Sequence, residues 1–159
     1  MINYLNYKLF NKLMNIKQTD FESQEFENYQ NLMIVPELIE DEQNIYSSSS
    51  ISFYKYAKNQ VNLNYIKKPD IVLEQRSIDW FGPTLLITTT ALTQNPELIS
   101  ITLNVISNYI TDFLKGRNEP NIKFSLLIQE SRTRFKKLDY EGNKEGLKEV
   151  DKLIKQLKK

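Results

Sequence analysis

Apolar positions at helical spacing mark residues 96–115 as a long core helix. Asn95 suits the N-cap, Pro96 suits the first helical position, and Gly116 suits the left-handed residue that follows a helix. The apolar side chains that recur at steps of three and four are Ile99, Leu103, Ile106, Ile110 and Phe113. Neighbouring apolar positions widen this stripe, and so wide an apolar face needs cover on more than one side. Residues 96–115 are therefore predicted to be the central helix of the domain.

Alternation of Ile122, Phe124, Leu126 and Ile128 with Lys123, Ser125 and Gln129 predicts a β-strand over 122–129. Residues 131–133 can reverse the chain into a second strand over 134–141. A last amphipathic helix follows, with Leu147 and Ile154 on its apolar seam. Residues 121–159 are thus predicted to form a β-hairpin followed by a helix.

The N-terminal third combines helical spacing with connecting segments. Residues 1–17 place apolar side chains, among them Leu5 and Leu9, at helical steps, which predicts an amphipathic helix. Residues 18–31 are polar and acidic and suit a connector, so both segments are candidates for the periphery of the domain.

Short extended segments are predicted between this connector and the central helix. Residues 32–39 suit a strand at a sheet edge, because Pro36 cannot donate to a ladder. The serines 47–50 suit a loop or the cap of a short helix over 51–61. Residues 63–66 and 70–76 suit a hairpin or two separate strands.

Residues 84–94 admit two structures. Their threonines favour a strand, whereas Pro83, Leu85 and Leu92 allow a helix, and we expect a buried helix that breaks at residue 95. The whole chain is predicted to be one α+β domain over residues 1–159. Its small, mostly antiparallel sheet includes the C-terminal hairpin, packs on the central helix and is flanked by amphipathic helices at both termini.

Composition narrows the possible chemistry. The 159 residues include 21 Lys and Arg against 20 Asp and Glu, so a net charge of +1 gives no general attraction to nucleic acid. The absence of Cys and His removes disulfides, thiolate and imidazole metal ligands, and every Ser-His or Cys-His arrangement. The four glycines form no phosphate-binding pattern. We expect no cofactor and no resident metal.

The sequence gives no expectation of a membrane protein. The N-terminal residues show no uninterrupted apolar core of a signal peptide. The weakly charged residues 80–111 are broken by polar clusters into pieces too short for a bilayer, which requires about 20 apolar residues. The lack of Cys fits a reducing compartment, so a cytoplasmic location is expected. The many Asn, Lys, Ile and Tyr residues are typical of AT-rich genomes, such as those of low-GC bacteria and their mobile elements.

One motif suggests an enzyme. Asp70 follows a proline before an apolar run, with Glu74 after that run and Glu130 at the end of the 122–129 strand. This arrangement resembles metal-dependent nucleases, in which two carboxylates hold Mg²⁺ beside a lysine. Arg132 replaces that lysine here and cannot act as a base. A divergent Mg²⁺-dependent nuclease is therefore an alternative, against turn and surface roles for these carboxylates.

A second alternative is nucleic-acid binding by residues 132–137, where basic side chains surround Phe135. We favour a different explanation, because edge strands commonly carry Lys and Arg to prevent aggregation.

Missing catalytic groups and several apolar helix faces favour an interaction protein. The expected function is that of a non-enzymatic accessory or regulatory subunit of a bacterial or mobile-element complex, able to self-associate. Trp80 and Phe81, beside a Gly-Pro turn, are either a partner anchor or a core plug. The terminal helices, through Leu5 and Leu9 at one end and Leu147 and Ile154 at the other, pack either within the chain or on a partner.

Overall fold

A computed structural model describes residues 15–20, 31–75, 79–114, 116, 120–131 and 134–157. Within these ranges, the side chains of residues 15–20, 134 and 153–157 lie outside the description. The chain is an α+β protein with two mixed sheets.

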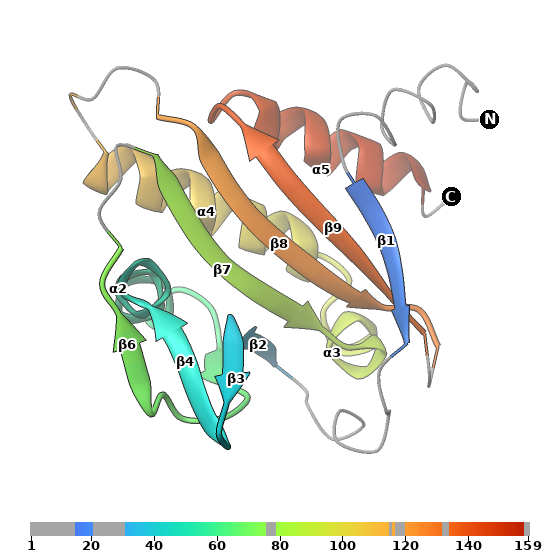
Figure 1. Cartoon of the computed structure of the whole chain (residues 1–159). Coiled ribbons are helices and arrows are strands. Elements are labelled where there is room, and N and C mark those ends of the chain that lie inside the picture. The colour runs from blue at the N-terminus through green and yellow to red at the C-terminus, as the bar shows by residue number, and fades with distance from the viewer. Residues whose placement is uncertain are drawn as a thin grey trace.

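The main sheet has six strands and mixed polarity (Figure 1). The β7–β8 and β2–β5 pairs are parallel, while β1–β9, β9–β8 and β7–β2 are antiparallel. The prediction of a mostly antiparallel sheet is therefore only partly right. In spatial order, the strands are β1 (Asn15–Asp20), β9 (Arg134–Gly142), β8 (Ile122–Gln129), β7 (Trp80–Ile87), β2 (Leu32–Val35) and β5 (Leu63–Tyr65).

A small sheet of three strands stands beside the β7 side of the main sheet (Figure 1). Its order is β3 (Leu38–Glu40), β4 (Gln43–Ser47) and β6 (Ile71–Leu73), with β3 antiparallel and β6 parallel to β4. The turn between β3 and β4 consists of Asp41 and Glu42, at φ 50° and 62°. Two positive φ values are those of a type I′ turn, which matches the twist of a two-stranded hairpin.

In the view of Figure 1, α4 and α5 cross behind the main sheet, α2 lies beside β7, and α3 follows the end of β7. The described helices are α2 (Ser48–Ala57), α3 (Thr89–Gln94), α4 (Leu98–Phe113) and α5 (Gly146–Leu157). Phe53 of α2 and Tyr109 of α4 contact the Trp80 ring at centroid distances of 5.8 and 5.4 Å. These contacts place the main core between the helices and this face of the sheet.

The opposite face of the main sheet carries a smaller cluster of buried side chains. The cluster consists of Met33, Leu86, Leu127 and Phe135. Leu85 and Ile87 point to the main core while Leu86 points to this cluster, because successive side chains of a strand alternate between faces. β7 is therefore apolar on both sides.

This two-sided burial explains the error at residues 84–94. Residues 84–87 continue β7, and only Thr89–Gln94 form a helix, capped by the Thr88 hydroxyl, which accepts from the Ala91 N–H at 3.1 Å. A central strand with both faces buried lacks polar alternation, so its sequence resembles a buried helix.

The C-terminal predictions are confirmed. β8 and β9 form the antiparallel hairpin, and α5 follows. The central helix is confirmed over Leu98–Phe113, but it begins later than predicted because residues 96 and 97 form a turn. Asn95 caps that turn, its side-chain oxygen accepting from the Glu97 N–H at 3.2 Å.

The N-terminal predictions need correction where they can be compared. Residues 15–20 form the edge strand β1 rather than the end of a helix and the start of a connector, because they complete the ladder of β9. Residues 1–14, with Leu5 and Leu9, and residues 21–30 lie outside the described part. β2 is flanked by β7 and β5 and is therefore not an edge strand. Pro36 lies past its end, where the chain passes to the small sheet.

The two extended segments after α2 are separate strands rather than a hairpin. β5 joins the main sheet and β6 joins the small sheet. The predicted short helix is confirmed as α2, with Ser47 as its N-cap.

Candidate binding surface

Exposed apolar side chains concentrate on the small sheet. Leu38 and Ile39 of β3 are 51% and 57% exposed, and Val72 and Leu73 of β6 are 51% and 54% exposed. Among the described residues, the other large apolar side chain as exposed is Phe113, at the end of α4. Such clustering of apolar surface is typical of interaction sites. Because successive side chains of a strand alternate between faces, Leu38 and Leu73 lie on one face of the small sheet, and Ile39 and Val72 lie on the other. We call the four small-sheet residues, together with Phe81, the binding surface.

An open pocket of about 370 Å³ lies between the small sheet and the start of β7. Leu38, Ile45 and Leu73, one from each strand of the small sheet, form its apolar part. We call it the acidic pocket, because its described lining includes the carboxylates of Glu37 and Glu74. Among the described residues, its lining consists of Glu37, Leu38, Ile45, Ser47, Leu73, Glu74, Gln75, Phe81 and Gly82.

Glu37 fixes the wall of this pocket to the start of α2. Its carboxylate accepts hydrogen bonds from the Ser47 N–H, from the Ser47 hydroxyl at 2.8 Å and from the Ser50 hydroxyl. The Ser47 hydroxyl in turn accepts from the Ser50 N–H at 3.1 Å, which is the N-cap bond of α2. A carboxylate at this end also suits the positive end of the helix dipole.

Gln75 lines the acidic pocket. Its backbone N–H donates to the Ser48 hydroxyl at 2.9 Å, which anchors the segment after β6 to α2. Its side-chain oxygen is buried and accepts no hydrogen bond from the described residues.

A second pocket of about 260 Å³ shares Phe81 and Gly82 with the first. The Lys123 ammonium lies in it, 5.0 Å from the centroid of the Phe81 ring and 3.4 Å from the Glu141 carboxylate. We call it the mixed-charge pocket, because its lining includes the ion pair of Lys123 and Glu141. Its lining is Phe81, Gly82, Lys123, Phe124, Ser125, Asp139, Tyr140 and Glu141.

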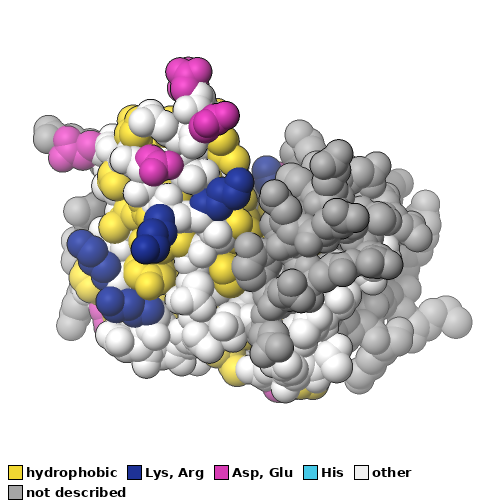
Figure 2. Space-filling view, turned by 90° about the horizontal axis from the view of Figure 1, so that it is seen from below, with side chains coloured by type: hydrophobic (Ala, Val, Ile, Leu, Met, Phe, Trp, Pro, Cys, Tyr) yellow, Lys and Arg dark blue, Asp and Glu magenta, His cyan; other side chains and the backbone are white. Residues whose placement is uncertain are grey.

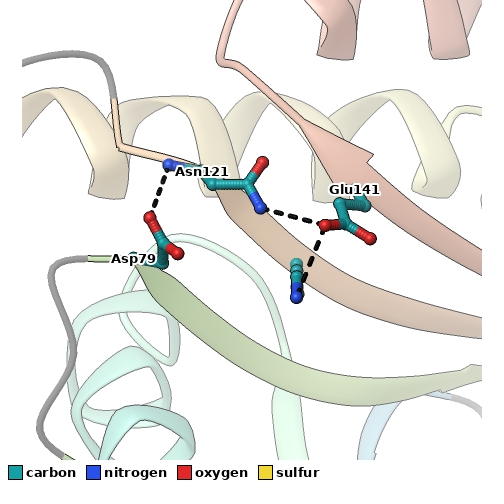
Figure 3. A network of polar contacts seen from close by, with 4 residues as sticks. Asp79, Asn121 and Glu141 are labelled. Carbon is teal, nitrogen blue, oxygen red and sulfur yellow. Dashed lines mark hydrogen bonds and ion pairs between the residues drawn. The ribbon is translucent and has the colours of Figure 1, made fainter.

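A polar network next to the mixed-charge pocket includes Asp79, Asn121 and the lining residue Glu141 (Figure 3). Asn121 donates from its backbone N–H to Asp79 at 3.2 Å and from its side chain to Glu141 at 3.1 Å. These contacts tie the starts of β7 and β8 to the end of β9. The hydrogen bond from Asn121 and the charge of Lys123 lower the pKa of Glu141 below its ordinary value, so this carboxylate stays ionised at neutral pH.

Trp80 and Phe81 lie in different environments, and the packing role predicted for the pair is confirmed for Trp80 alone. Trp80 is 4% exposed and is a core residue, whereas Phe81 lies between the two pockets. Gly82 makes room for Trp80, since a Cβ there would lie 2.4 Å from the indole ring. The chain irregularity between Phe81 and Thr84 in the β7–β8 ladder accompanies this close approach.

Buried tyrosines beside the small sheet remain neutral. Tyr46 donates its hydroxyl to the Lys67 carbonyl at 2.6 Å, and burial raises its pKa well above the ordinary value. Burial also raises the pKa of Tyr65 to about 12. Neither phenol is thus prepared to act as a base at neutral pH.

The predicted nuclease residues are not brought together. Asp70 accepts from the Asn44 backbone N–H at 2.8 Å in the small sheet, while Glu130 pairs with Lys136 at 2.5 Å beyond the end of β8. Glu74 lines the acidic pocket. The described residues contain no group of three carboxylates, or other ligating side chains, that could hold a metal ion.

The basic segment 132–137 differs from its predicted edge position. β9 lies between β1 and β8, so the proposal that these basic residues protect a sheet edge is wrong for this strand. Phe135 is fully buried and therefore unable to stack on a base. Lys136 and Lys137 pair with Glu130 and Asp139 at 2.5 and 3.6 Å. Residues 132 and 133 lie outside the described part.

The seam of α5 packs within the chain where it is described. Leu147 is 2% exposed and belongs to the main core, and the Ser100 hydroxyl of α4 donates to Asp151 of α5 at 2.7 Å. The side chain of Ile154 lies outside the description. Leu147 is therefore a packing residue rather than a surface contact.

Sequence reasoning missed the residues that form the binding surface. Leu38, Ile39, Val72 and Leu73 occur in short apolar runs, which periodicity assigns to buried strands. The sequence feature that could have indicated an exposed position for Leu38 and Ile39 is the acidic segment Glu40-Asp41-Glu42 that follows them. Viewed from below, one face of the molecule combines apolar side chains with Lys and Arg, and acidic side chains gather at its border (Figure 2).

Comparisons with protein-family models, with curated proteins and with solved structures found no match to this chain. Among the described residues, no helix has the length and apolar character needed to cross a membrane.

Proposed function

We propose that this protein is a non-enzymatic interaction protein that binds a partner protein through the binding surface. The observation that carries the proposal is the concentration of Leu38, Ile39, Val72 and Leu73, all more than half exposed, on one small sheet. Large exposed apolar groups are unfavourable in water and are retained where a partner covers them. An accessory or regulatory subunit of a larger complex is the role that this surface serves best.

The edges of the small sheet support binding of an extended segment. The Asp70 N–H donates to the Asn44 carbonyl at 2.9 Å. In a parallel strand, every second residue forms its backbone hydrogen bonds with the same neighbouring strand. Asp70 bonds to β4, so Ile71 and Leu73 direct their backbone groups to the side of β6 that faces away from β4. No described strand pairs with that side of β6. An added strand would satisfy these groups, as in other proteins that extend a sheet edge with a partner peptide.

The proposal is tested by affinity capture from cells of the source organism with wild-type protein and the double variant Leu38→Asn/Leu73→Asn. Covering one half-exposed leucine contributes about 1 kcal/mol, so the double variant should bind a partner about 30-fold more weakly. Phe113→Asn is the matched control, because Phe113 is equally exposed but lies outside the surface. Light scattering over a range of concentrations measures self-association of the same proteins.

A partner or oligomer retained by the control and lost by the double variant is the expected result. Circular dichroism must show that both variants are folded. Equal capture by all three proteins, or a monomer that captures nothing, would contradict the proposal.

A further inference from the structure

The end of α2, β5 and the residues that follow β5 carry a basic surface. The rings of Tyr54 and Tyr65 lie 4.2 Å apart and join α2 to β5. The Lys58 ammonium lies 5.7 Å from the centroid of the Tyr54 ring. Residues 43–69 contain four lysines, all exposed, and no Asp or Glu. We call this region the lysine surface, and its lysines are Lys55, Lys58, Lys67 and Lys68.

Tyr46 holds the residues after β5 against this region. Its hydroxyl donates to the Lys67 carbonyl at 2.6 Å, and the centroid of its ring lies 5.1 Å from that of Tyr65. The lysines of α2 and those after β5 therefore lie on neighbouring segments. Between them, the side chains of Tyr54, Tyr65 and Ile66 are only partly buried and offer apolar area to a partner.

The hairpin of β3 and β4 has the opposite charge. Glu40, Asp41 and Glu42 are exposed at its end, next to the half-exposed Leu38 and Ile39. Residues 36–54 contain no Lys or Arg. Among the residues that the structure describes, neither these three carboxylates nor the lysines of the lysine surface form an ion pair. Both sets of charges can therefore pair with groups from outside the chain.

A two-fold axis would bring the two sets of charges together between copies. Figure 2 shows Lys and Arg side chains among apolar ones on one face, with acidic side chains at its border. Because a two-fold axis joins the same face of both molecules, each contact between the acidic and the basic part occurs twice.

We infer that the lysine surface binds the β3–β4 hairpin of a second copy of this chain, so that Leu38 and Ile39 are covered beside the charges. This inference rests on the proposed function and names a second copy as the partner.

A second copy accounts for both charged regions with one kind of contact. A nucleic acid or an acidic segment would complement the lysines, but the acidic hairpin would repel it. A basic segment would complement the hairpin and leave the lysines without partners. Stacking of a base is also obstructed, because Lys58 and the Tyr65 ring already lie against the Tyr54 ring.

Light scattering of the full chain over a range of concentrations measures this association. Glu40→Lys/Glu42→Lys reverses the charge of the hairpin, and Lys58→Glu/Lys68→Glu reverses that of the lysine surface. Each variant alone should dimerise about 30-fold more weakly than the wild type, because several exposed ion pairs are replaced by repulsion. An equal mixture of the two variants should recover the dimer. In the mixture, the reversed hairpin meets the reversed lysine surface, and the other contact is that of the wild type.

A matched control separates this pairing from a general effect of charge. Glu145→Lys/Glu149→Lys changes the net charge as much as the hairpin variant does, at exposed positions outside both regions, and should dimerise like the wild type. Circular dichroism checks that every variant is folded. The wild type provides a measurement that needs no variant: raising the NaCl concentration from about 0.05 to 0.5 M should weaken its dimer, because exposed ion pairs are screened.

Several results would overturn the inference. They are a wild type that stays monomeric, a dimer that salt and both variants leave unchanged, and a mixture that fails to recover the dimer. Binding of a single-stranded oligonucleotide by a monomer, lost in Lys58→Glu/Lys68→Glu, would show that the lysine surface serves a nucleic acid instead. Capture of a different partner by a monomeric protein, lost in Leu38→Asn/Leu73→Asn, would leave the proposed function intact and refute this inference alone.

Discussion

Removal of the Glu37 carboxylate tests the link between the small sheet and α2. In Glu37→Ala, the Ser47 N–H and the Ser47 and Ser50 hydroxyls lose their acceptor. Ser47 and Ser50 are only 8% and 0% exposed, so water cannot freely replace the Glu37 carboxylate as an acceptor. Their hydroxyls still lie 3.1 Å apart, and one can donate to the other.

One buried hydroxyl proton and one backbone N–H are thus left without a partner. Because each unsatisfied buried donor costs about 1–3 kcal/mol, we expect the two together to lower the free energy of unfolding by at least about 2 kcal/mol. For a chain of this size, a loss of about 2 kcal/mol lowers the melting temperature by about 4 to 8 °C. Glu37→Gln keeps a neutral acceptor and should lose about half as much.

Urea unfolding followed by circular dichroism measures this effect, with Glu40→Ala as control. Glu40 is an exposed carboxylate of the same strand region, and its replacement should change stability by less than about 0.5 kcal/mol. The slope of the unfolding free energy against urea concentration should stay the same, while the urea concentration at the midpoint falls. Equal midpoints for Glu37→Ala and Glu40→Ala would refute the role of the Glu37 carboxylate.

Three further predictions concern glycines and tyrosines. Gly82→Ala should destabilise the fold by about 2 kcal/mol in urea unfolding, because the new Cβ would lie 2.4 Å from the Trp80 ring; wild-type stability would contradict this packing. Gly146→Ala places a Cβ 2.3 Å from the Tyr140 hydroxyl and should destabilise the fold. In a double-mutant cycle, Tyr140→Phe should recover part of the stability that Gly146→Ala loses, and strictly additive effects would argue against the contact. Burial raises the pKa of Tyr65 from 10.0 to about 12, so the stability that its neutral form contributes is complete below pH 10 and is lost as the pH rises through 12. The urea midpoint should therefore fall over this range, less so in Tyr65→Phe, and an identical fall in that variant would exclude Tyr65 as a cause.

Some elements could be predicted because the order of apolar and polar residues along the chain indicates the type of element. β8 alternates apolar and polar residues, and α4 repeats apolar residues at helical spacing, so each pattern identified its element. Ser47 lies just before α2, where a short hydroxyl side chain favours a helix start. These signals depend only on neighbours along the chain.

The candidate site was far less predictable. Asp70 and Glu130 suggested one catalytic site, yet Asp70 lies in the small sheet and Glu130 beyond the end of β8 in the main sheet. Phe135 suggested a nucleic-acid contact, yet it is fully buried. Short motifs of this kind do not specify which face of a strand or which sheet receives a side chain.

The sequence by itself therefore determined the central helix, the C-terminal hairpin, the helix after it and the α+β class. Tertiary structure decided that β7 is a central strand with two buried faces, that β3 and β6 share a small sheet, and that Leu38 and Leu73 remain exposed. The physical reason is that strand pairing and exposure depend on residues distant in the chain, whereas caps and periodicity depend on residues within a few positions.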